Sequence, residues 1–432
     1  MAETDTDAAD QFDERIQKGR LDESTPGLWR RIGRLPRNVF AISLVSLFND
    51  ASSEIVYPFL PLFLALLGAS PLAIGAIEGA AESVSGLLKL FSGYFSDRRG
   101  RRKGLVVFGY ALAGLMRPLL AFVGTWPQAL FVRLCDRVGK GIRSAPRDAM
   151  IADAAAPAER GLAFGFHRAM DHAGAVVGPL IGYAILSFIA ANRNAPTAAD
   201  YRTLFLLASV PALLAVLVAA FFVRETRRDE RTNTLQTPAL SRLSLRGFDG
   251  NFKRFLAILA LFTLSNSSDA FLLLRAREAG IGAATIPLLW AALHVSKVLS
   301  SLVGGDLSDR LGRRTLIASG WTLYAAVYFG FAFVTSIGEA WILFLIYGIY
   351  FGLAEGAEKA LVADLVRPEQ RGTAYGLYNL AYSVTVFPAS LLMGALWHWR
   401  GAATAFIVSA CVGSSAALLL VLTVRPGVRH RR

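Results

Sequence analysis

Charged residues are scarce in this chain. They make up 18% of its 432 residues, whereas 54% of the residues are hydrophobic. A soluble protein of this length needs many more polar residues to cover its surface. The few charges gather in the N-terminal tail, the middle and short loops, with long apolar runs between them. The run 203–223 has no charged residue, and it is long enough to cross about 30 Å of hydrocarbon as a helix. The composition therefore indicates a polytopic membrane protein.

Cysteine and the motifs of enzymes are also rare or missing. The two cysteines, Cys135 and Cys411, fall inside apolar runs, so we expect neither a disulfide nor redox chemistry. The sequence has no phosphate-binding loop, no metal-ligand cluster and no nucleophile spaced to meet a base. It therefore predicts no enzyme, no catalytic residue, no metal and no cofactor. The first 37 residues contain no apolar stretch before a cleavage site, so we expect the first span to direct membrane insertion.

The apolar runs predict twelve transmembrane helices in an all-α protein. The expected spans are 38–66, 71–97, 104–123, 127–153, 160–190, 201–223, 253–274, 282–308, 315–336, 340–365, 371–398 and 401–424. The polar stretch 224–252 divides them into two groups of six. We therefore predict a tail (1–37), an N-terminal bundle (38–223), a cytoplasmic linker (224–252), a C-terminal bundle (253–424) and a basic tail (425–432).

The net charge of +13 does not indicate a nucleic-acid partner, because the basic residues lie at the ends of the spans. With both termini in the cytoplasm, roughly thirty Lys and Arg residues face the cytoplasm and about five face outward. This asymmetry predicts cytoplasmic termini in the cytoplasmic (inner) membrane.

Two pairs of segments repeat at nearly one offset. GYFSDRRGRR from Gly93 returns as GDLSDRLGRR from Gly305, and ADAAAPAERGLAFGF from Ala152 returns as ADLVRPEQRGTAYGL from Ala363. The offsets are 212 (305 minus 93) and 211 (363 minus 152). Such agreement indicates duplication of a six-helix unit.

These residues resemble the major facilitator superfamily over nearly the whole chain. The loop from Gly93 and its copy match the signature that the family carries after its second and eighth helices. The resemblance implies a latch that holds one conformation, in which each Asp pairs with an Arg across the interface between the halves. The residues expected in it are Gly93, Asp97, Arg98, Gly100, Arg101, Gly305, Asp309, Arg310, Gly312 and Arg313.

Two further segments carry the resemblance. The segment from Arg137 to Ala145 resembles the family's arginine motif, with Arg137 as its buried arginine. Gly174, Gly178, Pro179 and Gly182 resemble the Gly-Pro signature of proton-coupled exporters, although Tyr183 stands where that pattern has another glycine. Glycines at such spacing also serve ordinary close helix packing. The block 136–153 resembles a poorly characterised prokaryotic branch of the family.

Ionisable residues follow one face of the fourth span and recur in the first and fifth. A charge facing acyl chains costs at least about 2–3 kcal/mol, so this face must meet water, substrate or opposite charge. Two interpretations stay open: structural ion pairs between helices, or the lining of a central cavity. The candidates for a substrate cavity are Asn49, Asp136, Lys140, Arg143, Arg147, Asp148, Asn266, Asp269, His294, Lys297, Glu355, Glu358, Tyr378 and Tyr382.

Proton coupling needs a buried carboxylate whose charge a neighbouring cation can stabilise. The candidates are Asp50, Glu54 and Asp171, with Arg137, Arg168 and His167 beside them. The corresponding part of the second half has fewer charges, so we expect the coupling chemistry in the first half.

The sequence thus predicts a monomeric secondary transporter that moves a small solute by alternating access. Proton-coupled antiport with efflux is the leading interpretation. The alternative is a proton symporter or uniporter that imports an organic anion. A non-transporting membrane sensor would need a larger signalling domain than the short tail and linker provide. The expected partners are membrane lipid, a small-molecule substrate and protons.

Overall fold

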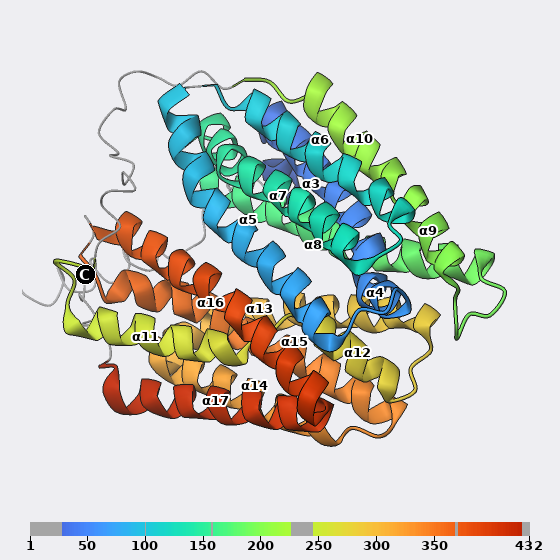
Figure 1. Cartoon of the computed structure of the whole chain (residues 1–432). Coiled ribbons are helices and arrows are strands. Elements are labelled where there is room, and N and C mark those ends of the chain that lie inside the picture. The colour runs from blue at the N-terminus through green and yellow to red at the C-terminus, as the bar shows by residue number, and fades with distance from the viewer. Residues whose placement is uncertain (1–27, 100, 157–158, 226–244, 368–369, 426–432) are drawn as a thin grey trace, which may run out of the picture.

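The computed structural model describes residues 28–99, 101–156, 159–225, 245–367 and 370–425. Within these ranges, the side chains of residues 28–29, 90, 93–94, 96–99, 160–161, 301–310 and 371–372 are not described. Every regular element of the described residues is a helix (Figure 1). The prediction of an all-α membrane protein is confirmed by ten helical segments that are long and apolar enough to cross a membrane.

The first half of the chain forms one group of helices, shown in blue to green in Figure 1. After the short α2 (Leu28–Gly33) come α3 (Arg37–Val56), η1 (Tyr57–Phe59), α4 (Leu60–Leu66), α5 (Pro71–Arg99), α6 (Lys103–Leu119), η2 (Leu120–Phe122), α7 (Trp126–Ala154), α8 (Arg160–Ile189), α9 (Ala198–Leu207) and α10 (Ser209–Phe221). Proline interrupts the first long helix, because Pro58 and Pro61 lie at the starts of η1 and α4 and supply no backbone donor.

The second half forms a second group, shown in yellow to red. It consists of α11 (Gly250–Ser265), α12 (Ala270–Glu278), η6 (Ala283–Thr285), α13 (Ile286–Leu311), α14 (Arg313–Phe333), α15 (Ile337–Asp364), α16 (Arg371–Arg400) and α17 (Ala402–Thr423). The predicted span 253–274 is divided here, since α11 ends at Ser265 and α12 begins at Ala270. The break falls on Asn266, Ser267, Ser268 and Asp269, residues that compete for backbone hydrogen bonds.

Two long helices, α5 and α7, are not among the ten apolar segments. Each has 29 residues, or about 43 Å at 1.5 Å per residue, which exceeds the hydrocarbon thickness. Their many charged side chains account for the difference. The two helices pack against each other, so the charges of one have those of the other as partners.

We call the end of the molecule where α10 finishes and α11 begins the linker end, and the opposite one the far end. The two groups of helices meet toward the far end. Helix α5 packs on α16, and α8 packs on α13. At the far end, Arg277 Nη2 donates to Asn194 O at 2.7 Å and Ala284 N donates to Arg193 O at 3.1 Å. Both contacts join the halves.

Glycines let α5 and α16 approach closely toward the far end. A Cβ built on Gly75 would lie 2.3 Å from Ser390 O, and one on Gly394 would lie 2.5 Å from Pro71 O. Farther along α5, toward the linker end, Ser83 Oγ donates to Ser383 O of α16 at 2.6 Å. From there the two groups diverge toward the linker end (Figure 1).

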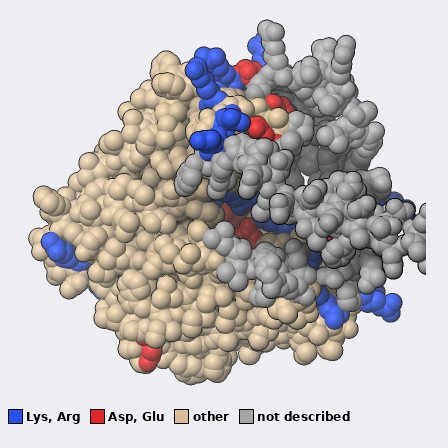
Figure 2. Space-filling model, turned by 180° about the vertical axis from the view of Figure 1, so that it is seen from behind, with Lys and Arg blue, Asp and Glu red and all other residues tan. Residues whose placement is uncertain are grey.

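Charged side chains gather on one side of the molecule, as Figure 2 shows, while the rest of that face carries few. Within the charged side lies a hollow with acidic and basic side chains in its depth. The surface around the helices is otherwise apolar, with large exposed side chains such as Phe188, Phe221 and Leu422. This distribution suits a protein surrounded by lipid, with a polar interior open at one end.

Candidate functional site

Two aspartates from different helices lie together because glycines allow those helices to touch. A Cβ on Gly174 of α8 would lie 2.6 Å from Leu47 O, and one on Gly178 would lie 2.5 Å from Ala51 O, both on α3. The backbones of α3 and α8 are therefore in direct contact. A Cβ on Gly174 would also lie 3.1 Å from Asp50 Cβ, so Asp50 faces the turn of α8 that follows Asp171, and the two carboxylates interact electrostatically.

Cations surround this aspartate pair. Both Arg143 and Arg147 of α7 interact electrostatically with Asp50. Nη1 of Arg147 donates to Ser46 Oγ at 3.3 Å, while Nη2 lies 2.9 Å from Asp148 Oδ1. On α8, His167 Nε2 lies 3.7 Å from Asp171 Oδ2. The pair therefore has guanidinium and imidazole groups within reach, the groups that can stabilise a carboxylate when its proton leaves.

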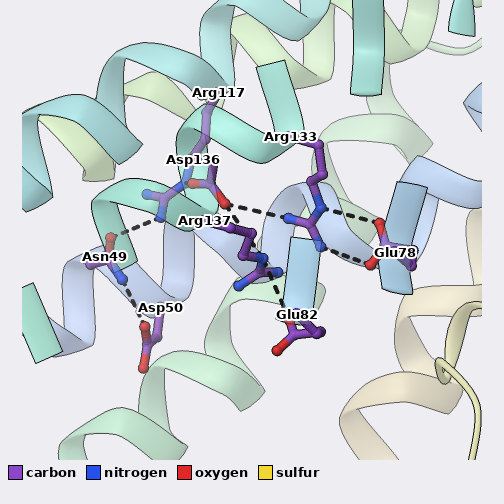
Figure 3. A network of polar contacts seen from close by, with 8 residues as sticks. All are labelled: Asn49, Asp50, Glu78, Glu82, Arg117, Arg133, Asp136 and Arg137. Atoms are coloured by element: carbon purple, nitrogen blue, oxygen red, sulfur yellow. Dashed lines mark hydrogen bonds and ion pairs between the residues drawn. The ribbon is translucent and has the colours of Figure 1, made fainter. Parts of the chain in front are cut away.

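A chain of polar contacts runs from the pair through the first half of the molecule (Figure 3). Asn49 Nδ2 donates to Asp50 Oδ1 at 2.8 Å, and Asn49 Oδ1 accepts from Arg117 Nη2 at 2.8 Å. Arg117 Nε lies 3.9 Å from Asp136 Oδ1. Arg137 Nε in turn lies 3.8 Å from Asp136 Oδ2. The chain thus links α3, α6 and α7.

The same chain continues to α5. Arg133 makes a two-pronged pair with Glu78, with Nε–Oε1 and Nη2–Oε2 distances of 3.1 and 3.0 Å. Arg137 Nε lies 3.5 Å from Glu82 Oε1. Glu78 is 1% exposed and Arg133 5%, so these pairs neutralise charge within the bundle rather than at its surface. They show how α5 and α7 tolerate their polar sequences.

Sequence reasoning did not include Glu78, Glu82 and Arg117 among its candidates. They are sparse charges within long apolar runs, so no dense charged face draws attention to them. The spacing of Glu78 and Glu82 by one helical turn was the available signal. It places both carboxylates on one face of α5, opposite the cations of α7.

The predicted first-half candidates divide into buried and more accessible side chains. Asn49, Asp136, Arg137, Arg143 and His167 are buried. Two nitrogens of Arg143 and both ring nitrogens of His167 have no hydrogen-bond partner among the described residues. The Arg143 guanidinium stacks on Tyr110 at 4.3 Å. Those that are half-buried or exposed are Asp50, Glu54, Lys140, Arg147, Asp148, Arg168 and Asp171.

The second-half candidates form a smaller cluster at the break between α11 and α12. Asp269 Oδ1 accepts from Tyr347 OH at 2.8 Å, and its Oδ2 lies 3.6 Å from Lys297 Nζ. Asn266 Nδ2 donates to Tyr350 OH at 3.2 Å. His294 is half-buried near them, and its ring is 5.1 Å from that of Trp290.

Ionisable groups of the two halves also interact with each other. Arg168 of α8 interacts electrostatically with Glu355 of α15. Glu82 of α5 does so with Tyr382 of α16. The side chains of Glu355 and Glu82 are 54% and 38% exposed. Mid-helix charges this exposed would be costly against acyl chains, so they line the polar interior. Glu358 and Tyr378 are instead buried.

The far end is closed by a contact between the halves at the base of the site. Trp290 Nε1 of α13 donates to Glu54 Oε2 of α3 at 2.7 Å. The ring of Trp290 also packs on Tyr57, with centroids 5.1 Å apart. A predicted proton-coupling carboxylate thus touches the opposite half of the molecule directly.

Most of the predicted latch lies outside the described residues. Gly100 is not described. Only the backbone is described at Gly93, Asp97, Arg98, Gly305, Asp309 and Arg310. Of the rest, Arg101 is exposed, and Gly312 has the positive φ of 86° that turns α13 into α14. Arg313 Nη1 lies 2.7 Å from Asp364 Oδ2. The equivalent pair in the first half is Arg102 with Asp153.

Comparison with known proteins decides the family. The sequence profile of the Major Facilitator Superfamily matches residues 42–390 and 255–432. The chain belongs to the major facilitator superfamily. It is therefore a transporter of small molecules, not an enzyme, as the sequence predicted.

Relatives within the superfamily cover most of the chain. It is 34% identical over 369 residues to an uncharacterized MFS-type transporter of Methanocaldococcus jannaschii, covering 84% of this chain and 89% of the relative. It is 25% identical over 357 residues to the multidrug resistance protein MdtG of Dickeya zeae, covering 80% of this chain and 82% of that protein.

Solved structures of the superfamily share the fold. A bacterial homolog of the human lysosomal transporter Spinster, inward-facing and occupied, superposes with a TM-score of 0.72. The match covers 89% of this chain and 95% of that chain at 16% identity. The D-xylose–proton symporter gives a TM-score of 0.71 at 18% identity, covering 91% and 99%. At these identities the likeness shows the fold alone.

Proposed function

We propose that this transporter is a proton-coupled antiporter that exports a small polar or amphipathic solute by alternating access. The observation that carries the proposal is the aspartate pair, Asp50 and Asp171, held together by glycine packing of α3 on α8. These two carboxylates, which both interact electrostatically with Arg147, repel each other when both are ionised. A proton relieves that repulsion, and so does an approaching cation.

The proposed topology has twelve transmembrane helices. The ten apolar segments supply ten of them, and α5 and α7 supply two more, because their charges pair with each other. Both termini lie in the cytoplasm and the linker end faces it, in line with the positive-inside rule. The protein works as a monomer in the cytoplasmic membrane.

In the proposed cycle, segments 38–223 and 253–424 rock against each other as two bundles. The contacts at the far end, including Glu54 with Trp290, hold the linker-open conformation. Protonation of the aspartate pair and binding of substrate are mutually exclusive, so each drives the other's release. Glu54 transmits the change to the far end, because it lies one helical turn from Asp50.

The proposed substrate-binding surface comprises the exposed and half-buried groups of the hollow. On one side are Lys140, Arg168 and Asp148; on the other are Lys297, Glu355 and Tyr382. Both charge signs are present, which suits a polar or amphipathic solute. The buried Asp136, Arg137 and Arg143 hold the helices in register instead of contacting substrate.

Two features support export. The glycines and proline of α8, Gly174, Gly178, Pro179 and Gly182, resemble the signature of proton-coupled exporters except at Tyr183. In addition, a relative that covers most of the chain is named a multidrug resistance protein.

The second candidate function is proton symport or uniport of an organic anion. Arg168 of α8 is exposed and Lys140 of α7 is half-buried, and both would attract an anion into the hollow. A similar fold serves a D-xylose–proton symporter. In this case protonation of the aspartate pair would favour substrate binding instead of opposing it.

We further propose that the two glycine-aspartate-arginine loops, at Gly93–Arg101 and Gly305–Arg313, form the latch of the linker-closed conformation. Each aspartate would pair with an arginine across the interface of the halves.

Transport in proteoliposomes tests the proposal. The purified chain is assayed with a panel of metabolites and drugs, with and without an imposed pH gradient of either sign. Antiport predicts substrate movement against the direction of proton flow, and symport predicts movement with it. Transport that no pH gradient changes would contradict proton coupling.

A further inference from the structure

The second half of the molecule buries a carboxylate among neutral donors. Glu358 of α15 is 7% exposed. Its Oε1 accepts from Trp321 Nε1 of α14 at 2.8 Å, and its Oε2 accepts from Tyr378 OH of α16 at 2.8 Å. Trp321 is fully buried and stacks on Phe262, with ring centroids 4.2 Å apart. Both donors are therefore fixed in place, from two different helices.

No cation within the described residues forms an ion pair with Glu358. The neighbouring Lys359 pairs with Glu355 instead, at 2.7 Å. The titratable groups that interact electrostatically with Glu358 are Glu355, Lys359 and Tyr350 on its own helix and Tyr382 on α16. From α13, Lys297 interacts with Glu355. An ionised Glu358 thus carries a net negative charge inside the bundle, which is costly in a medium of low dielectric constant.

The internal repeat shows that this arrangement is specific to the second half. At an offset of 211, Glu358 corresponds to Arg147, Trp321 to Tyr110 and Tyr378 to His167. Arg147 interacts favourably with Tyr110, whereas its charge disfavours a charge on His167. The two halves therefore hold opposite charges at one structural position, each between the same two partner positions.

Helix packing confirms this register. A Cβ on Gly109 would lie 2.7 Å from Arg143 Cβ, and one on Gly320 would lie 3.2 Å from Ala354 Cβ. These two glycines differ by 211, and so do their two partners. The sign of the charge is also reversed at the next position, which is Asp148 in the first half and Lys359 in the second.

We propose that Glu358 is a proton-binding site of the second half, loaded and unloaded during transport in addition to the aspartate pair of the first half. The inference rests on the proposed proton coupling and extends it to two proton sites, one in each half. Each carboxyl oxygen of Glu358 is already engaged by a neutral donor, and a proton is the one cation that adds to it without displacing either partner.

The Tyr378 hydroxyl allows the change. It donates to the carboxylate when Glu358 is ionised, and it accepts from the carboxylic acid when Glu358 is protonated, since a hydroxyl can do both. The proton comes from water and returns to it. The proton reaches Glu358 along the face of α15 that carries Glu355 and Lys359, whose side chains are 54% and 43% exposed.

Infrared difference spectroscopy tests this site without any substrate. The full chain is reconstituted in phosphatidylethanolamine–phosphatidylglycerol vesicles, and spectra in acidic and alkaline buffer are subtracted. The carboxylic acid C=O stretch reports each carboxyl group that gains a proton. We expect E358Q to lose one such band. Glutamine preserves the fold, because its Oε1 can accept from Trp321 and its Nε2 can donate to the Tyr378 hydroxyl. The matched control E355Q removes an exposed, lysine-paired carboxylate and should keep that band.

The outcomes separate this inference from the proposed function. A wild-type difference spectrum that E358Q leaves unchanged would overturn the inference and make Glu358 a purely structural acceptor. D171N is measured alongside. If D171N loses no band while E358Q does, the proton site in the second half stands and the aspartate pair fails.

Discussion

The indole nitrogen of Trp290 lies 2.7 Å from Glu54 Oε2 and joins the two halves of this transporter toward the far end. Glu54 lies one turn along α3 from Asp50, which interacts with Asp171. A single helix thus carries both a proposed proton site and a contact that closes the far end. A change at Asp50 can therefore reach Glu54 through one turn of the same helix.

Trp290→Phe should favour conformations that are open at the far end. The ring still packs on Tyr57, but the hydrogen bond to a carboxylate, worth about 1.5–3 kcal/mol, is lost. We expect the population open at the far end to rise at least about tenfold. Spin labels at Leu66 and Ile337, exposed residues of opposite halves at that end, report the distance.

Two controls belong to that measurement. The free cysteines, Cys135 and Cys411, are first replaced by serine so that only the chosen sites are labelled. Trp399→Phe removes the indole of a side chain that is 71% exposed at the same end, and should leave the distances unchanged. If Trp290→Phe gives the same distance distribution as Trp399→Phe, the contact does not hold the far end closed.

Glu78→Ala should destabilise the protein strongly. It leaves the Arg133 guanidinium buried without its two-pronged partner, a change that costs about 3–5 kcal/mol. We expect a clear fall in the apparent melting temperature of the purified protein in detergent. Glu278→Ala is the control, because Glu278 pairs with Arg275 at the far end with 46% of its side chain exposed. Such an exposed pair contributes up to about 1 kcal/mol.

The Glu78 prediction has a further test. Restoring the pair with exchanged charges, in the double variant E78R and R133E, should recover part of the lost stability. Equal melting temperatures for Glu78→Ala and Glu278→Ala would show that the pair between α5 and α7 does not stabilise the bundle.

Gly178→Ala should disturb the aspartate pair through helix packing. The added Cβ would lie 2.5 Å from Ala51 O, so α3 and α8 must separate, and overpacking of this kind costs about 1–3 kcal/mol. We expect lower thermal stability and weaker coupling of transport to a pH gradient. Gly165→Ala lies on the same helix with no atom within 4 Å of the new Cβ. If both variants behave alike, contact between the helices is not what holds Asp50 beside Asp171.

Helix positions could be predicted from the sequence, because hydrophobic runs and their ends are local features. The expected spans 71–97 and 127–153 correspond to α5, Pro71–Arg99, and α7, Trp126–Ala154. The charged face of α7 was also predictable, since it follows helical periodicity. The break at Asn266–Asp269 was not expected, because its few polar residues lie within an otherwise apolar run.

The partners of each charge could not be predicted. Pairing of Arg133 with Glu78, or of Glu358 with Trp321, joins residues 55 and 37 positions apart. Such contacts depend on which helices are neighbours and how they are rotated, and local periodicity does not specify either. The glycines of α8 did draw attention in the sequence, but their close contact with α3 is visible only in the fold.

Asp171→Asn provides the most direct test of the proposed mechanism. In proteoliposomes with a substrate found in the panel, the variant should lose transport driven by a pH gradient and keep substrate exchange across the membrane. Its amide cannot take up or release the proton, yet it preserves the size of the side chain next to His167. Gradient-driven transport at the wild-type rate in both Asp171→Asn and Asp50→Asn would contradict the proton-coupled mechanism.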